Sequence, residues 1–189
     1  MLVFDEADQL LDMGFRPAIT LMLSKLPPKH TRQTLLFSAT MPKDVRAIAE
    51  LGMREDYQFI DTVGKEENTH QHVPQHFLIT SKEAQARELW GLVEESTKEE
   101  GYKVVVFFTT ARLTQFYSEL FAAMGRDVLE IHSRKNQSQR TKVSDKFRDG
   151  SNLIMFTSDV SARGMDYPDV SSVIQVGAPT DKAQYIHSL

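Results

Sequence analysis

Acidic residues directly after an apolar run are the first candidates for chemistry. Met-Leu-Val-Phe at 1–4 leads straight into Asp5-Glu6-Ala7-Asp8. Adjacent carboxylates at the end of a buried strand are costly unless something cationic compensates them. In nucleotide hydrolases, Mg²⁺ held by a carboxylate and by substrate phosphates does so, which leaves the second acid to orient or deprotonate a water. The alternative is that these acids cap the following helix and favour its first turn.

Two hydroxyl residues follow a second apolar run. Thr34-Leu35-Leu36-Phe37 ends in Ser38-Ala39-Thr40, and Met41-Pro42 then opens a helical stretch. Ser38 and Thr40 could relay contacts between a site and a neighbouring element. The alternative is that they supply ordinary turn and cap hydrogen bonds before the helix.

A third stretch, residues 157–170, follows another apolar strand and combines polar and small residues. Thr157 and Arg163 suit phosphate oxygens, and Gly164 leaves room for a backbone to approach a ligand. Asp166 suits a ribose hydroxyl, which is the role that acids play in other nucleotide-binding folds. The alternative is a purely structural loop.

A basic cluster lies between residues 132 and 148, where Asp145 is the only acid. Such a cluster on a net-acidic chain predicts a patch that binds phosphates, whereas the alternative is a solvated helix face. Its members are Arg134, Lys135, Arg140, Lys142, Lys146 and Arg148.

Composition limits the classes of protein that these residues can belong to. The chain has 189 residues, 41% of them hydrophobic and 25% charged, which suits one domain or two small ones with a real core. No run of 18 apolar residues predicts a membrane span, and no secretory signal opens the chain. Cysteine is absent, which excludes disulfides and suits a reducing intracellular compartment. The net charge of −4 means that any nucleic-acid site must be a local patch.

The elements that must position these residues alternate between strand and helix. Long apolar runs such as 103–108 suit the centre of a parallel sheet, and the apolar stripe in 111–124 has helical spacing. Polar residues 61–74 predict a linker. We therefore predict a doubly wound α/β fold with parallel sheets covered by helices, in which ligands bind at the carboxyl ends of the strands. Strands are predicted at 1–4, 34–37, 57–60, 75–80, 103–108, 127–131, 153–157 and 172–176, and helices at 82–97, 111–124 and 137–149.

The order of the motifs resembles that of DEAD-box RNA helicases. Val3-Phe4-Asp5-Glu6-Ala7-Asp8 and the residues up to Phe15 are similar to the signature that names the family. Ser38-Ala39-Thr40, Gln137 to Arg140, Thr157 to Asp166 and Tyr185-Ile186-His187 resemble four further motifs, in order. Residues 131–170 are most similar to the branch with plant and organellar members.

This resemblance implies two RecA-like domains that bind ATP and RNA and remodel short RNA duplexes. Residues 1–60 would be the C-terminal part of the ATP-binding domain, 61–74 the linker, and 75–189 most of the helicase C-terminal domain, truncated at its end. The implied protein is intracellular, in the nucleus, cytoplasm or an organelle. It is monomeric, requires no membrane, and has little preference for RNA sequence.

The resemblance also implies roles for single residues. Asp5 would hold Mg²⁺ with Glu6 nearby, and Glu6 would activate water. Asp166 would touch the nucleotide. The residues that would couple nucleotide state to domain closure are Asp8, Ser38, Thr40 and His187. The residues that would line the RNA side are Arg140, Thr157, Arg163 and Gly164.

Two departures from the family pattern change what is expected of the chain itself. The phosphate-binding loop that precedes the acidic motif in the family is not in the sequence, and the sixth motif stops at His187-Ser188-Leu189. We expect these residues alone not to hydrolyse ATP at a helicase-like rate. The competing hypothesis is a non-enzymatic α/β module that binds RNA or a partner and has lost ATPase chemistry.

Overall fold

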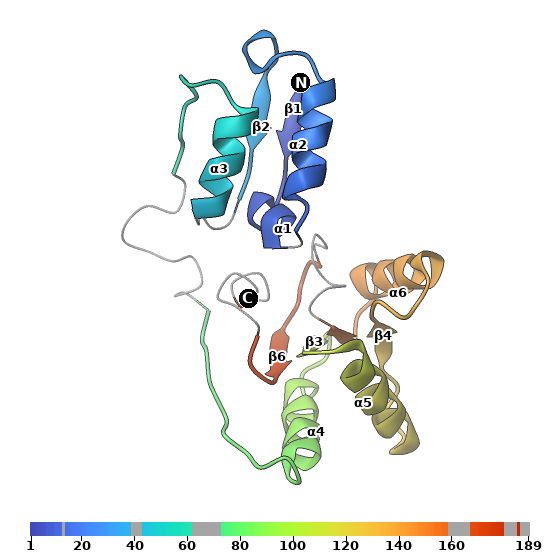
Figure 1. Cartoon of the computed structure of the whole chain (residues 1–189). Coiled ribbons are helices and arrows are strands. Elements are labelled where there is room, and N and C mark those ends of the chain that lie inside the picture. Colours follow the sequence, from blue (N-terminus) through green and yellow to red (C-terminus); the bar gives the residue numbers. More distant parts are fainter. Residues whose placement is uncertain (13, 39–42, 62–72, 159–166, 180–184, 186–189) are drawn as a thin grey trace. The chain divides into compact units, whose positions relative to one another are not determined.

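Alternating strands and helices build two separate parallel sheets in this chain, for which we obtained a computed structural model. The structure describes all residues except 13, 39–42, 62–72, 159–166, 180–184 and 186–189 (Figure 1). The chain divides into two units, Met1–His72 (unit 1) and Val73–Leu189 (unit 2). Each unit is described by itself below.

Unit 1 is built on a two-stranded parallel sheet. Strand β1 (Leu2–Phe4) pairs with β2 (Thr34–Leu36), with Leu2 opposite Thr34. Parallel strands need a long crossover, and here it contains helices α1 (Ala7–Asp12) and α2 (Arg16–Lys25) and a 3₁₀ turn at Lys29–Thr31. Helix α3 (Lys43–Gly52) follows β2.

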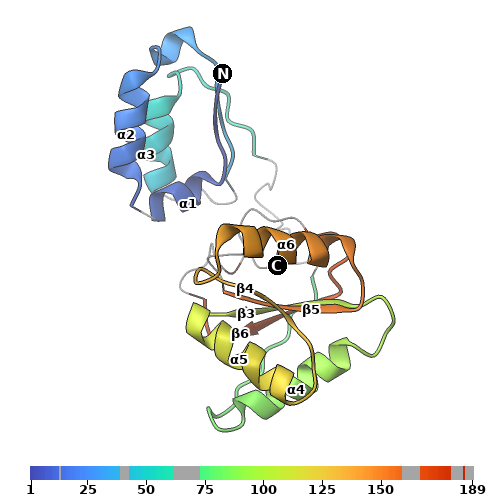
Figure 2. The ribbon, with the colours of Figure 1, turned by 90° about the vertical axis from the view of Figure 1, so that its right-hand side faces the viewer.

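The core of unit 1 lies between one face of this sheet and the helices (Figure 2). Phe4 and Ala7 pack there with Ile19 of α2 and with Val45 and Ile48 of α3. Successive side chains of a strand point to opposite faces, so Val3, between two inward residues, is 46% exposed. Among the described residues of unit 1, helices therefore cover one face of the sheet.

Unit 2 is built on a four-stranded parallel sheet with the order β4-β5-β3-β6. Its strands are β3 (Lys103–Phe108), β4 (Leu129–Ile131), β5 (Leu153–Ser158) and β6 (Ser172–Val176). Its helices are α4 (Gln85–Ser96), α5 (Ala111–Ala123) and α6 (Gln137–Asp149).

Both faces of the unit 2 sheet are covered by helices (Figure 2). Val104, Val106 and Phe108 of β3 belong to the core beneath α4 and α5. Val105, between them in the sequence, belongs to the core that contains Phe147 of α6. This alternation explains why β3 is apolar throughout, as central strands of parallel sheets are. The predicted fold class, parallel sheets covered by helices, is confirmed.

Most predicted elements are confirmed to within three residues, but two predicted strands are wrong. Residues 57–60 and 75–80 are not strands, and in the described part of the chain neither range pairs with a sheet. Phe59 and Phe77 are 59% and 90% exposed. Their apolar character is typical of strands, but a strand forms only where a neighbour accepts its hydrogen bonds.

Helix length bears on membrane association. Among the described residues, none of the helices is long and apolar enough to cross a bilayer.

Candidate functional site

The carboxyl end of β1 carries the two adjacent acids that the sequence singled out. Asp5 is exposed and Glu6 is half-buried. The backbone N–H of Glu6 donates to Asp5 Oδ1 at 3.0 Å. Glu6 has a φ of 49°, in the left-handed region that non-glycine residues seldom occupy. This turn ends the strand and leaves one oxygen of the Asp5 carboxylate beyond that backbone hydrogen bond.

Asp8 and Ser38 meet although thirty residues separate them. The Asp8 N–H donates to Ser38 Oγ at 3.2 Å, and the Asp8 side chain is buried, with 2% exposure. Backbone bonds hold the same junction, from Ala7 N–H to the Phe37 carbonyl at 3.0 Å and from Phe37 N–H to that of Phe4 at 2.8 Å. Ser38 thus accepts from one of the N–H groups that the first turn of α1 leaves without a helical partner. Hydrogen bonds from both the backbone and the Ser38 side chain therefore join the ends of β1 and β2.

The donors at this strand end fit a hard divalent cation. Carboxylate oxygens are the ligands that Mg²⁺ prefers, and Mg²⁺ usually takes one or two of them together with water and substrate phosphates. In the described part of the chain no three His, Cys, Asp or Glu residues gather into a metal cage. Asp5 and Glu6 would therefore share the ion with a phosphorylated ligand.

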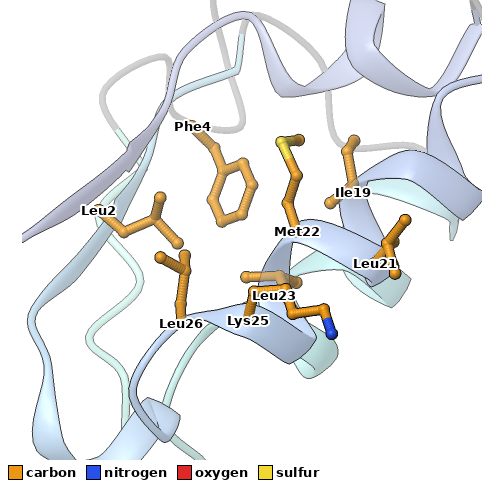
Figure 3. Close-up of a pocket in the computed structure, with 8 residues that line it drawn as sticks. All are labelled: Leu2, Phe4, Ile19, Leu21, Met22, Leu23, Lys25 and Leu26. Atoms are coloured by element: carbon orange, nitrogen blue, oxygen red, sulfur yellow. The ribbon is translucent and has the colours of Figure 1, made fainter.

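A pocket of about 530 Å³ lies elsewhere in unit 1, between β1 and α2 (Figure 3). Leu2 and Phe4 of the strand face Ile19, Met22 and other apolar side chains across it. Lys25 is the only charged residue in its lining, which also includes Leu21, Leu23 and Leu26. An apolar lining does not suit a phosphorylated ligand, so this pocket is not the site that the acidic residues predict.

Unit 2 presents basic residues at the corresponding edge of its sheet. Helix α6 begins after β4, where Asn136 Oδ1 accepts from the Gln139 N–H at 2.9 Å and Gln139 Oε1 accepts from the Asn136 N–H at 3.2 Å. Such a reciprocal capping box fixes the start of a helix. Arg140 lies one turn into α6 and donates from Nη2 to Gln137 Oε1. The first turn of α6 is therefore a fixed platform for Arg140.

The far half of α6 is anchored by buried side chains. Lys103, at the start of β3, is 3% exposed, and its Nζ donates to the Arg148 carbonyl at 2.8 Å. The Tyr167 hydroxyl donates to Ser144 Oγ at 3.1 Å, and the Tyr167 ring packs edge-on against Phe147. Burial raises the pKa of Tyr167, so this hydroxyl stays protonated and able to donate.

Thr157 lies at the same sheet edge, but it is fully buried. The residue has 0% exposure, and its hydroxyl donates to the Ser158 carbonyl at 3.3 Å. Ile131 at the end of β4 stands opposite Thr157 in the sheet, which places Thr157 beside the strand that leads to α6. The predicted phosphate-binding hydroxyl thus contacts backbone here rather than solvent.

The remaining predicted site residues, Thr40, Arg163, Gly164, Asp166 and His187, lie outside the described residues. Asp5, Glu6, Asp8 and Ser38 come together at one edge of unit 1. Arg140 and Thr157 lie on neighbouring elements of unit 2.

Sequence reasoning missed a hydrogen-bonded network beside α6. Buried His132 lies 2.6 Å from Glu130 through its Nε2, and Lys135 pairs with the second oxygen of Glu130 at 2.9 Å. Arg134 donates from Nη1 to Gln115 Oε1 of α5 at 3.1 Å. The spacing of Glu130 and His132 was an available signal, because residues two apart in an extended segment point to the same side.

Two protein families match the chain. The DEAD/DEAH box helicase family matches residues 1–48, and the helicase conserved C-terminal domain family matches residues 82–189. Among curated relatives, DEAD-box ATP-dependent RNA helicase 25 of Oryza sativa subsp. japonica is 49% identical over 191 residues. That match covers 100% of this chain and 32% of the relative. The protein of the same name from Arabidopsis thaliana is 48% identical over 100% of this chain and 34% of its own length. The chain thus spans about a third of the length of the curated relatives it matches.

Two solved structures resemble the whole chain. Mss116p bound to ssRNA and AMP-PNP has a TM-score of 0.82 and 30% identity over 98% of this chain and 39% of its own. S. cerevisiae Dbp5 bound to RNA and ADP BeF3 has a TM-score of 0.81 and 26% identity over 99% of this chain and 48% of its own. These likenesses agree with the predicted fold class.

Proposed function

The chain belongs to the DEAD-box helicase family, and from that premise we propose that it forms part of an ATP-dependent RNA helicase. Residues 1–60 are the C-terminal part of the ATP-binding RecA-like domain in this proposal. Residues 61–74 are the linker, and 75–189 belong to the helicase C-terminal RecA-like domain. The division into units near residue 72 supports this assignment.

Unit 1 supplies the chemistry of ATP hydrolysis. Asp5 is the residue that holds Mg²⁺, because its carboxylate is exposed at a strand end, where α/β folds bind ligands. The ion supplies positive charge to the phosphates when bound. Glu6 orients or deprotonates the attacking water, and its carboxylate is the base nearest Asp5 in the chain. Asp166 contacts the nucleotide in this proposal.

The junction of Asp8 with Ser38 transmits the state of the nucleotide. A displacement of the Asp5–Asp8 turn would strain the 3.2 Å bond from Asp8 N–H to Ser38 Oγ and so reach the end of β2. Small shifts spread in this way because packed elements do not deform continuously. Thr40 and His187 extend the same coupling in this proposal.

Unit 2 supplies the RNA surface. Arg140 is the phosphate contact, since α6 carries it on a first turn that a capping box fixes. Thr157 shapes the end of β5 from its buried position, and Arg163 and Gly164 follow it in the sequence. Phosphate contacts carry no base information, which fits a protein with little sequence preference.

The observation that carries this proposal is the hydrogen bond from the Asp8 N–H to Ser38 Oγ. This bond joins the acidic turn, residues 5–8, to the end of β2 at one edge of the unit 1 sheet. We suggest testing it in a chimera in which residues 1–189 replace the matching part of the rice helicase 25, because the match spans this whole chain. The chimera is expected to hydrolyse ATP in an RNA-dependent manner, and Glu6→Gln is expected to abolish that turnover while Mg-ATP and RNA stay bound.

Glu55→Gln is the matched control, because Glu55 is an exposed glutamate in a turn of the same unit. The proposal is wrong for Glu6 if Glu6→Gln hydrolyses ATP like the Glu55→Gln control. A chimera that binds RNA without any ATP turnover would favour the competing non-enzymatic module.

A further inference from the structure

The loop between β4 and α6 carries two neighbouring cations with different partners. Lys135 Nζ lies 2.9 Å from Glu130 Oε2, so a carboxylate balances its charge. Arg134 Nη1 donates at 3.1 Å to Gln115 Oε1, which is a neutral amide oxygen. Within the described part of the chain, Arg134 has no carboxylate partner. The Arg134 side chain is therefore held in place while its full positive charge is retained.

The partner of Arg134 is itself oriented. The amide nitrogen of Gln115 donates to Glu119 Oε1 at 2.8 Å, one turn further along α5. Because the amide nitrogen is used in this way, the amide oxygen is directed to the guanidinium. Gln115 thus connects α5 to the loop that precedes α6.

The backbone at Arg134 is fixed by a buried histidine. His132 is 1% exposed, and its Nδ1 accepts from the Arg134 N–H at 3.1 Å. An accepting Nδ1 carries no proton, so Nε2 carries it and donates to Glu130 Oε1 at 2.6 Å. The Lys135 N–H donates to the His132 carbonyl at 3.0 Å and closes a turn. Little conformational freedom remains for Arg134 to lose when it binds a ligand.

Arg134 lies near the carboxyl ends of the unit 2 strands, which is the edge where α/β folds bind their ligands. Ile131, the last residue of β4, stands opposite Thr157 of β5, so the loop begins beside the carboxyl end of β5. Helix α5 begins just after the end of β3, and the hydroxyl of Thr110 caps its first turn. Arg134 therefore lies at the carboxyl edge of the parallel sheet, where doubly wound folds bind their ligands.

We propose that Arg134 is a preorganised phosphate-binding residue for an RNA backbone and that Gln115 positions it. The inference rests on the RNA-binding function proposed above for unit 2. A guanidinium has five N–H donors, and the bond to Gln115 uses one of them. The others form a planar fork that suits the oxygens of a phosphate. Gln115 is a positioning residue and makes no contact with RNA itself.

Three variants that change the net charge equally test this inference in the 189-residue chain. Arg134→Gln removes the proposed contact. Gln115→Glu puts a carboxylate against Arg134, and Lys98→Gln removes a cation near the end of α4, outside the cluster. Because each variant lowers the net charge by one, the long-range electrostatic attraction to RNA changes equally in all three. Differences in RNA affinity among the variants therefore report local contacts. The measurement is fluorescence anisotropy with labelled oligouridine across a salt series.

Arg134→Gln and Gln115→Glu are each expected to weaken binding by about three- to tenfold at low salt. Each is also expected to flatten the slope of log K against log salt by roughly 0.7. Lys98→Gln is expected to leave the slope unchanged. Arg134→Lys retains the charge, so it should lose affinity while keeping the slope.

Gln115→Glu separates binding from a structural role, because the carboxylate still accepts from Arg134 and so keeps the bridge from α5 to the loop. It also loses the bond from the Gln115 amide to Glu119, so a lower Tm does not decide between the two roles, but a merely structural Arg134 would still predict normal RNA binding for Gln115→Glu. The inference is overturned if Arg134→Gln behaves like Lys98→Gln, or if Gln115→Glu binds RNA as the wild type does. Should Arg134→Gln fail to fold, the Gln115→Glu result decides alone. Absence of any RNA binding by the wild-type chain would overturn this inference together with the RNA role of unit 2.

Discussion

The two units present opposite charges at the same topological position. Both have parallel strands whose carboxyl ends carry polar loops. In unit 1 that edge holds the acids Asp5 and Glu6, whereas in unit 2 it holds the bases Arg134 and Arg140. In the proposed function, the same backbone architecture binds a metal ion with phosphates in one unit and RNA phosphates in the other. The side chains after the strands, rather than the fold, determine what each unit can bind.

The units also differ in how completely they bury their sheets. In the described residues, the unit 2 sheet has four strands with helices on both faces, whereas the unit 1 sheet has two strands and one covered face. Burial of apolar side chains is the main stabilising term in folding. Unit 2 is therefore expected to be the more stable unit, and mutations should affect the two units separately.

The largest expected effect concerns the acidic edge, the carboxyl edge of the unit 1 sheet that carries Asp5 and Glu6. In the rice chimera, Glu6→Gln should lower ATP turnover by about 10²–10⁴-fold, the usual contribution of a general base. RNA affinity should stay within about twofold, because the proposed RNA surface lies in unit 2, away from the substituted residue. Steady-state ATP hydrolysis and anisotropy on the same preparations measure both. Equal losses of turnover and RNA affinity would contradict a division of labour between the two edges.

The next effect concerns the core of unit 2. Phe156→Ala removes a fully buried ring that contacts Phe108 and Phe121, so it should lower the unfolding free energy of unit 2 by about 3–5 kcal/mol. Ile19→Ala in unit 1 should cost less, about 2 kcal/mol, because Ile19 already borders the pocket. Urea unfolding followed by hydrogen exchange of each unit measures both. Loss of protection in unit 1 of Phe156→Ala would show that the units do not unfold separately.

A smaller effect concerns the basic edge, the carboxyl edge of the unit 2 sheet that carries Arg134 and Arg140. Arg140→Ala should weaken oligouridine binding several-fold and flatten the salt slope by roughly 0.7, because one phosphate contact is lost. Oligoadenosine should respond equally, since the contact reads no base. Lys98→Ala, outside the cluster, should change neither quantity. A base-dependent response to Arg140→Ala would indicate that Arg140 contacts bases rather than phosphates.

The smallest effect concerns the hydrogen bond between Asp8 and Ser38, which joins the ends of β1 and β2. Ser38→Ala deletes the acceptor of the Asp8 N–H and should cost unit 1 about 0.5–1.5 kcal/mol. The exchange of the Asp8 amide should accelerate correspondingly. Ser24→Ala is the matched control, since Ser24 is exposed and its hydroxyl donates to the Leu21 carbonyl within the same helix. If Asp8 exchanges no faster in Ser38→Ala than in Ser24→Ala, the junction does not hold the acidic turn.

Helices and strands were predicted correctly from the sequence where the local pattern of apolar residues determines the structure. The prediction failed where strand formation depends on a pairing partner distant in the sequence. The helical spacing in 111–124 and the apolar run 103–108 gave α5 and β3. Residues 75–80 look like a strand locally, but no neighbour pairs with them in the described chain.

The same limit applies to the candidate sites. Asp5 and Glu6 were found because they are adjacent in the sequence. The partner of Arg134 lies nineteen residues away on another element, so only the fold brings Gln115 to it. The sequence pattern also did not predict that Thr157, a residue type whose hydroxyl suits phosphate, is fully buried near the end of β5.

The most direct test of the contrast between the two edges is the salt dependence of RNA binding by two double variants of the 189-residue chain. Asp5→Asn with Glu6→Gln neutralises the acidic edge, and Arg134→Gln with Arg140→Gln neutralises the basic edge. With about three phosphate contacts, the wild-type slope of log K against log salt should be roughly −2. The basic double variant should fall to roughly −0.7, and the acidic double variant should stay near the wild-type value. Equal slopes for the two double variants would contradict the assignment of RNA binding to the basic residues of unit 2.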